Sequence, residues 1–251
     1  MKLFSTLAIL LTCFQAASAH DTWVELDNPR VQEDGLIKVS LKQGNDHDDF
    51  NVHGPLNAAD ACLTANMPCG CRIDIKPTMT KAYWSAEYKP TKPGLHVVSH
   101  LNTKQNDRER EITSAKAYFV VGSNPTATKG PLMRCDRPLG HPLEIVPITN
   151  PVTQTVPNKP LRVRVLFEKQ PLPNVRVTFI PEGATGKLTA QKTDMKGEAE
   201  FIPAEANLYL VVVHKKSGNS GPDYDSTAYT ATLTVAVPAI PFPAVAKSSI
   251  Q

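Results

Sequence analysis

The chain has 251 residues, of which 41% are hydrophobic and 20% charged, and its formal net charge is +3 at pH 7. This length suits one large or two ordinary domains, and so small a charge favours neither a phosphate-binding surface nor a nucleic-acid partner. Beyond residue 13 no apolar stretch approaches the roughly 20 residues that cross a bilayer, so we expect no membrane span.

Residues 1–19 have the features of a secretory signal peptide. An apolar run from Leu3 to Cys13 follows Met1-Lys2, and Ala17-Ser18-Ala19 forms an A-x-A cleavage site in front of His20. Cleavage there would make His20 the first residue of a periplasmic or secreted protein. Its α-amine and imidazole could then chelate one metal ion, so processing itself would create a candidate ligand.

Residues 20–121 are predicted to form an N-terminal β-sandwich domain. Its expected strands are Thr22–Leu26, Leu36–Leu41, Ala82–Tyr88, Leu95–Leu101 and Ala115–Val121. Residues 57–81 carry three cysteines and show no clean alternation of apolar and polar residues. We therefore expect a disulfide-pinned loop there, inserted in the first domain.

Four cysteines follow the signal: Cys62, Cys69, Cys71 and Cys135. In an oxidising compartment an even number favours two disulfides. A bond between Cys69 and Cys71 is the least favourable, because a one-residue spacer strains the bond geometry. We expect Cys62 to pair with one of these two and Cys135 with the other. The alternative is a soft set for Cu(I), formed by Met67 and the two neighbouring thiols.

The second half is predicted to be another antiparallel β-sandwich. Residues 122–140 have the composition of a linker, residues 141–237 form the domain, and residues 238–251 form a loosely packed tail. The expected strands are Leu161–Phe167, Val175–Ile180, Glu198–Ile202, Leu208–Val213 and Thr227–Val235. The 22 prolines argue against long helices. The predicted fold class is all-β, with two Ig-like or transthyretin-like sandwiches in tandem.

Three further histidines are candidate partners for an N-terminal imidazole. His96 and His100 are four residues apart on one expected strand, so their side chains share a face. His214 ends the apolar strand of the second domain. Asp21 and Asp225 could orient ligand imidazoles. Each of these residues could instead belong to an ordinary core or surface.

Several motifs together resemble one protein family. They are His20-Asp21-Thr22-Trp23-Val24-Glu25, residues 139–147 with Asn150-Pro151, Thr193-Asp194 with Gly197, and Val213-His214 followed by Asp225-Ser226. In these the chain is similar to the periplasmic domain-of-unknown-function family related to NikM-like nickel/cobalt-uptake proteins. The second half also resembles carboxypeptidase-regulatory and collagen-adhesin B-type modules. The resemblance implies two β-sandwiches in the bacterial periplasm and a link to transition-metal handling.

These observations favour a metal-binding protein over an enzyme. The preferred function is capture of Ni²⁺, Co²⁺ or Cu²⁺ and delivery to an uptake transporter or another periplasmic protein, with nitrogen-rich ligand sets favouring copper or nickel. One alternative is a copper-dependent polysaccharide monooxygenase, which would pair an N-terminal histidine with a β-sandwich; the 6% aromatic content counts against it. Another is a metal-free adhesion or carbohydrate-binding module. No hydrolase motif occurs, so we expect no catalytic residues.

Overall fold

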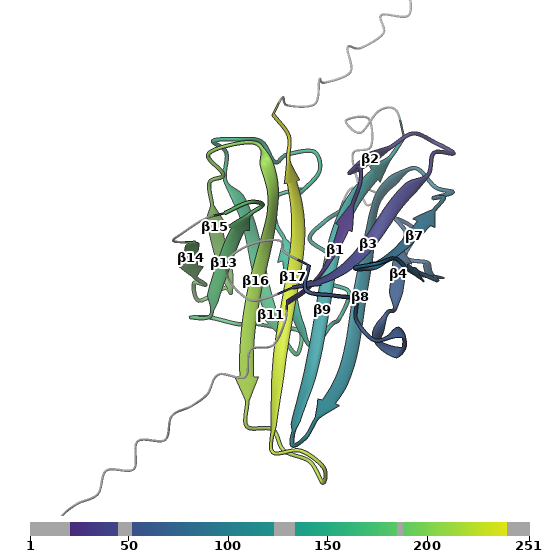
Figure 1. Ribbon diagram of the computed structural model, residues 1–251. Coiled ribbons are helices and arrows are strands. Elements are labelled where there is room, and N and C mark those ends of the chain that lie inside the picture. The colour runs from purple at the N-terminus through teal and green to yellow at the C-terminus, as the bar shows by residue number, and fades with distance from the viewer. Residues whose placement is uncertain (1–20, 45–51, 123–133, 185–187, 240–251) are drawn as a thin grey trace, which may run out of the picture.

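The computed structural model describes residues 21–44, 52–122, 134–184 and 188–239 (Figure 1). Within these ranges the chain forms strands and loops, apart from one turn of 3₁₀ helix, η1 (Ala58–Asp60). The predicted all-β fold class is confirmed. No helix in the described ranges is long and apolar enough to span a bilayer.

The strands fall into two sets along the chain. The first set is β1 (Asp21–Leu26), β2 (Arg30–Val31), β3 (Ile37–Gly44), β4 (Leu63–Asn66), β5 (Arg72–Ile75), β6 (Thr78–Met79), β7 (Trp84–Tyr88), β8 (Gly94–Asn106) and β9 (Glu109–Val121). The second set is β10 (Leu143–Pro147), β11 (Leu161–Phe167), β12 (Gln170–Pro171), β13 (Arg176–Pro181), β14 (Thr189–Lys192), β15 (Glu198–Phe201), β16 (Asn207–Ser217) and β17 (Ser226–Val237).

Each of the ten expected strands has a counterpart in the structure, but three are much longer than expected, and one of these is β16, which covers 11 residues. β8 continues to Asn106 and β9 begins at Glu109. The expectation of a loop over residues 57–81 is wrong, because this segment contains β4, β5 and β6. Three of the four residues of β5 are exposed, so that strand lacks the alternation that marks a half-buried strand in a sequence.

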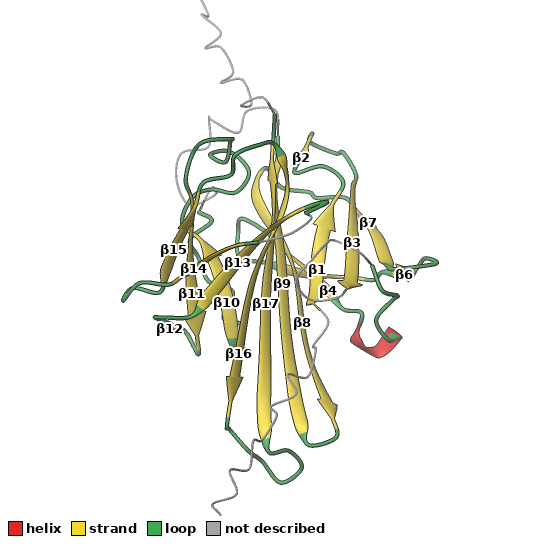
Figure 2. Cartoon of the chain, turned by 60° about the vertical axis from the view of Figure 1, so that its left-hand side comes forward, coloured by secondary structure: helices red, strands yellow, loops and turns green. Residues whose placement is uncertain are grey.

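The strands form three sheets, here called A, B and C. Sheet A has the order β1-β3-β7-β6. Sheet C has the order β10-β11-β12, and β15 is also paired with β11. Sheet B has nine strands in the order β14-β13-β16-β17-β9-β8-β4-β5, with β2 also on β9. Most pairs are antiparallel, but β17 and β2 both run parallel to β9. Sheet B therefore contains strands from both halves of the chain (Figure 2).

β9 lies at the centre of the molecule and is buried on both faces. Ala117 and Phe119 belong to the hydrophobic cluster shared with sheet A, whereas Tyr118 and Val120 belong to the cluster shared with sheet C. Successive side chains of a strand point to opposite faces, so one strand contributes to two cores. The two halves are thus joined by a sheet that extends through both. Residues 123–133 of the predicted linker lie outside the described ranges, and residues 134–140 contain no strand.

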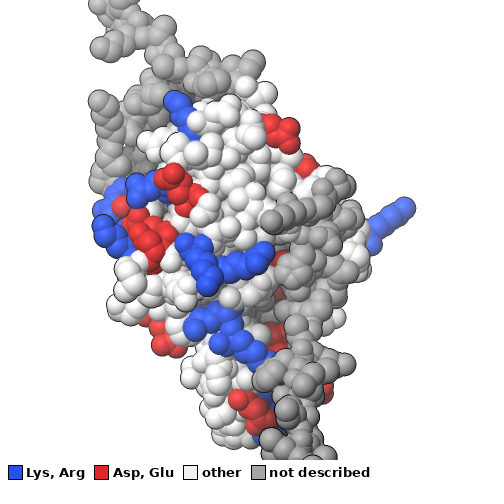
Figure 3. Space-filling model, turned by 90° about the vertical axis from the view of Figure 1, so that its left-hand side faces the viewer, with Lys and Arg blue, Asp and Glu red and all other residues white. Residues whose placement is uncertain are grey.

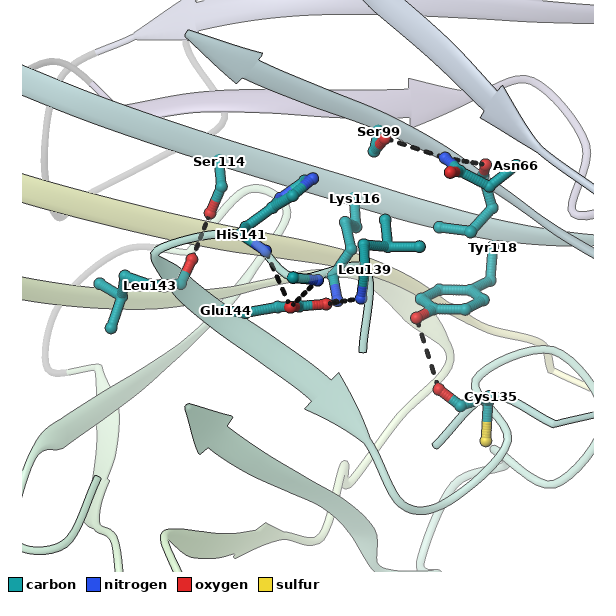
Figure 4. A network of polar contacts seen from close by, with 12 residues as sticks. Asn66, Ser99, Ser114, Lys116, Tyr118, Cys135, Leu139, His141, Leu143 and Glu144 are labelled. Atoms are coloured by element: carbon teal, nitrogen blue, oxygen red, sulfur yellow. Dashed lines mark hydrogen bonds and ion pairs between the residues drawn. The ribbon is translucent and has the colours of Figure 1, made fainter. Parts of the chain in front are cut away.

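One charged pair lies inside this junction. Lys116 of β9 and Glu144 of β10 are 2% and 1% exposed, and the Lys116 Nζ donates to Glu144 Oε1 at 2.8 Å (Figure 4). Glu144 also accepts hydrogen bonds from the backbone N–H groups of residues 139, 140 and 141. Burial lowers the pKa of Lys116. Burial alone would raise the pKa of Glu144, but Lys116 and the backbone donors outweigh it and lower that pKa. The carboxylate therefore stays ionised beside the ammonium.

Charges on the surface are arranged differently. On the face shown in Figure 3, basic and acidic side chains lie interspersed, in keeping with a net charge of only +3. Arg162 and Arg164, for example, both pair with Glu198. Such exposed pairs contribute little to stability, since water and salt screen them.

We predict that Lys116→Met lowers the free energy of unfolding by about 3 to 5 kcal/mol, because it leaves the buried Glu144 carboxylate without its cation. The measurement is urea denaturation at pH 7. Arg162→Met, which removes a half-exposed partner of Glu198, serves as the control and should cost about 1 kcal/mol or less. Equal losses in the two variants would show that the buried pair has no special role.

Candidate functional site

A cavity of about 260 Å³ lies between sheet A and sheet B, beside the start of β1. Its floor includes Asn102, Thr113 and Thr230, which are paired across β8, β9 and β17 and so form one row. Thr22 of β1 and Asp60 of η1 are among its walls. The lining is rich in amides, hydroxyls and carboxylates, which suits a small polar or ionic ligand better than an apolar one.

His100 is the imidazole in the lining of this cavity. Its side chain is 1% exposed, and its Nδ1 lies 2.9 Å from the carbonyl oxygen of Cys62. Because a carbonyl accepts only, Nδ1 carries the proton, and Nε2 is left with a lone pair. That Nε2 is buried and has no hydrogen-bond partner among the residues that the structure describes. Burial also lowers the pKa of His100, so the ring is neutral at pH 7.

The thiol of Cys62 lies next to this ring. Its sulfur is 3.6 Å from Nδ1 of His100 and donates to the carbonyl oxygen of Leu101 at 3.2 Å. Partial burial raises the pKa of Cys62, so the group is a neutral thiol and a poor nucleophile at pH 7. The pair is therefore not an activated cysteine–histidine dyad, and Cys62 instead holds the imidazole through its backbone.

The start of β1 is fixed by two contacts to sheet B. Nε2 of His214 lies 2.7 Å from the Asp21 carboxylate, and the Thr232 hydroxyl donates to the carbonyl of Thr22 at 2.7 Å. His214 continues the floor row, since it pairs with Thr230. We expected Asp21 to orient a ligand imidazole; in the structure the imidazole that it contacts is that of His214.

The structure does not bring the three candidate histidines together. His96 is four residues from His100 on β8, about 13 Å along the strand, and His214 is three strands away, about 14 Å. His96 is fully buried, with Nε2 2.7 Å from the Lys92 carbonyl and its ring stacked on Phe119. Across the described ranges no group of three His, Cys, Asp or Glu side chains could hold a metal ion.

His20 and Asp225 are the two remaining residues of the predicted site. His20 lies outside the described residues. Asp225 is paired with Arg108, and it precedes β17 by one residue, whereas Thr230 opposite His214 is five positions further on. About 16 Å of strand separates those positions, so Asp225 lies far from His214.

The two predicted disulfides are absent, and all four cysteines are free. Their sulfurs face different partners. Cys62 bonds the Leu101 carbonyl, the buried Cys135 faces the Ile148 carbonyl at 3.8 Å, and the side chains of Cys69 and Cys71 are hydrogen-bonded to each other. The expected pairing is therefore wrong.

The polar floor of the cavity was missed in the sequence. Asn102, Lys104 and Asn106 all line it and continue the face of His100 at a spacing of two. This alternation was a usable signal, but the expected strand stopped at residue 101. Glu111 lies opposite on β9 and accepts a hydrogen bond from Asn106 at 2.7 Å.

His141 is a third buried imidazole, on the opposite face of sheet B from the cavity. It is 8% exposed, and its Nδ1 has no hydrogen-bond partner. Burial and, after it, the charge of Lys116 lower its pKa to about 4, against the opposing effect of Glu144. His141 is thus neutral in the native protein at pH 7.

The sequence profile described as "Domain of unknown function (DUF4198)" matches residues 17–217. No curated protein matches the chain. Among solved structures, the D0-D1 domain of intimin is 17% identical, with 86% of this chain and 98% of that chain covered and a TM-score of 0.25. A DUF4785 family protein from Legionella pneumophila is 12% identical, with 76% of this chain and 51% of that chain covered and a TM-score of 0.31. A two-domain fibronectin type III segment of chicken tenascin is 12% identical, with 86% of this chain and 100% of that chain covered and a TM-score of 0.24.

We predict that stability falls between pH 6.5 and pH 4 and that His141→Gln makes this fall smaller. The folded-state pKa of His141, about 4, lies below its ordinary 6.5. The unfolded chain therefore binds the extra proton, and stability is lost as the pH falls through this window. The shift corresponds to about 3 kcal/mol at most. Urea denaturation at pH 7 and pH 4.5 measures the difference. Parallel losses in wild type and variant would contradict the assignment.

Proposed function

We propose that this chain, which belongs to the DUF4198 family of unknown function, is an exported protein that binds one Cu²⁺, Ni²⁺ or Co²⁺ ion. Removal of residues 1–19 would expose the amine and imidazole of His20. The ion is cargo, which the protein passes to an uptake transporter or another periplasmic protein, as a relation to NikM-like proteins would imply.

The observation that supports this proposal most directly is the unpartnered Nε2 of His100 in the cavity lining. A neutral imidazole nitrogen with a free lone pair is able to accept a metal ion, and this one faces a polar cavity. Metal-binding histidines typically donate their other ring N–H to a carbonyl or carboxylate, which fixes the tautomer. The Cys62 carbonyl holds His100 in that way.

The position of β1 supplies the second support. Thr22 lines the same cavity, and Asp21 is tied to His214. The described chain therefore begins beside this cavity. The amine and ring of His20, together with His100, would give three nitrogen donors. Such a set suits Cu²⁺ and Ni²⁺ in particular.

The other candidate histidines have different roles in this proposal. The His96 ring is bonded to the Lys92 carbonyl and packed on Phe119, within the core. His214 is assigned to holding the start of β1 through Asp21. Neither is needed as a ligand, so the proposed site depends on His20 and His100.

Transport of the ion is favoured over polysaccharide oxidation by the surroundings of the cavity. None of the described residues that line it is Phe, Tyr or Trp. A copper enzyme acting on a polysaccharide would need a flat face with exposed aromatic rings, which stack on sugars. The lining instead offers amides and carboxylates, which hold a hydrated ion well.

We predict that the mature chain starting at His20 binds about one Cu²⁺ per molecule, with nitrogen ligands visible by electron paramagnetic resonance. Isothermal titration with Cu²⁺ and Ni²⁺ gives the affinities. One extra alanine before His20, or His100→Gln, should weaken binding at least tenfold, since each removes a ligand atom or its orientation.

His141→Gln is the matched control, because His141 is also buried and also has a ring nitrogen without a partner among the described residues, but lies on the other face of sheet B. It should bind the metal as wild type does. Equal affinity in the alanine-extended and native proteins would refute the N-terminal site. Absence of any binding would leave the metal-free β-sandwich as the better description.

The copper-loaded protein should release no oxidised sugars from chitin or cellulose when supplied with peroxide. Mass spectrometry of the soluble products measures this. Oxidised oligosaccharides that disappear in His100→Gln would instead establish the monooxygenase function.

A further inference from the structure

The tip of the β4–β5 hairpin carries two thiols in a defined geometry. The Gly70 N–H donates to the Met67 carbonyl at 2.9 Å, and the Met67 N–H donates to the Cys71 carbonyl at 2.9 Å. Gly70 has φ +86°, a left-handed conformation that favours glycine in such three-residue hairpin loops. Cys69 therefore lies within a tight turn and Cys71 directly after it, and both are exposed.

The two sulfurs already interact with each other. The Cys71 thiol donates to the Cys69 sulfur, and the Cys71 backbone N–H donates to the same sulfur. The S–H contact shows that the two sulfurs are close, and the backbone N–H can still offset the charge of Cys69 once both thiols have lost their protons. A disulfide between the two would be strained by the one-residue spacer, so close sulfurs here suit a shared ion better than a covalent bond.

Positive charge lies beside the turn. Nη1 of Arg137 is 3.6 Å from the place where a side chain on Gly70 would begin, so the guanidinium covers the loop. Lys92 is close enough to stabilise a Cys69 thiolate. Two thiolates and one monovalent cation carry a net charge of −1, which these two side chains would offset.

We propose that Cys69 and Cys71 bind one Cu(I) ion through both sulfurs. Two S–H bonds are lost and two Cu–S bonds form, with release of two protons and no change in oxidation state. Thiolates are soft ligands that select Cu(I), and no third His, Cys, Asp or Glu in the described ranges completes a larger set for another metal. This site shares no residue with His20 and His100, so it stands independently of the function proposed above.

The test uses the mature chain, reduced and freed of reductant under anaerobic conditions, and titrated with Cu(I) in competition with bicinchoninate. Wild type should take about one Cu(I) per chain, with sulfur ligands in the X-ray absorption spectrum. Cys69→Ser/Cys71→Ser should lose this equivalent. Its Cu²⁺ affinity should not change, which separates the thiol site from His20.

Cys135→Ala is the control for thiol number, because Cys135 is buried and burial raises its pKa to about 11. It should keep the Cu(I) equivalent. Circular dichroism and the melting temperature confirm that the serine variant is folded, as expected for exposed positions. Equal Cu(I) uptake by wild type and the serine variant would overturn the proposal, as would Zn²⁺ binding to the pair in the absence of Cu(I) binding.

Discussion

The buried ion pair between Lys116 and Glu144 determines how the two halves of the protein fit together. β9 is covered by sheet A on one face and by sheet C on the other, so a lysine in its middle has no route to water. A charge in such a place is tolerated only beside an opposite charge with its hydrogen bonds complete. Glu144 meets this need and also binds the backbone of residues 139–141, so one carboxylate sets both the position of β10 and the approach of the chain to it.

The alternation of side chains along β9 keeps this junction separate from the cavity. Lys116 points towards sheet C, whereas Thr113 and Ala115 face the side on which β1 and His100 lie. A residue on one face can therefore change without altering contacts on the other. The proposed ligand His100 and the structural pair share a sheet but not a core, which leaves the cavity free to vary in its chemistry while the joint stays fixed.

Much of the fold follows from local pattern, and much of the site does not. The alternation in residues 161–167 gave β11 its observed bounds, and the even spacing of His96 and His100 correctly placed them on one face. The pairing of β17 with β9 joins segments far apart in sequence, and no local pattern records it. The partner of Lys116 and the hydrogen bond from His214 to Asp21 depend on that pairing, so they could not be predicted. The disulfide prediction failed because it rested on the number of cysteines, and the sequence does not show in which direction each side chain points in the fold.

The parallel contact between β9 and β17 also constrains the order in which the molecule can form. Ser226 and Glu109 meet although 117 residues separate them, and contacts of such sequence separation form slowly. The central strand cannot acquire this neighbour until the chain through residue 234 has emerged from the ribosome. Until then β9 presents an open edge, which is a site for mispairing.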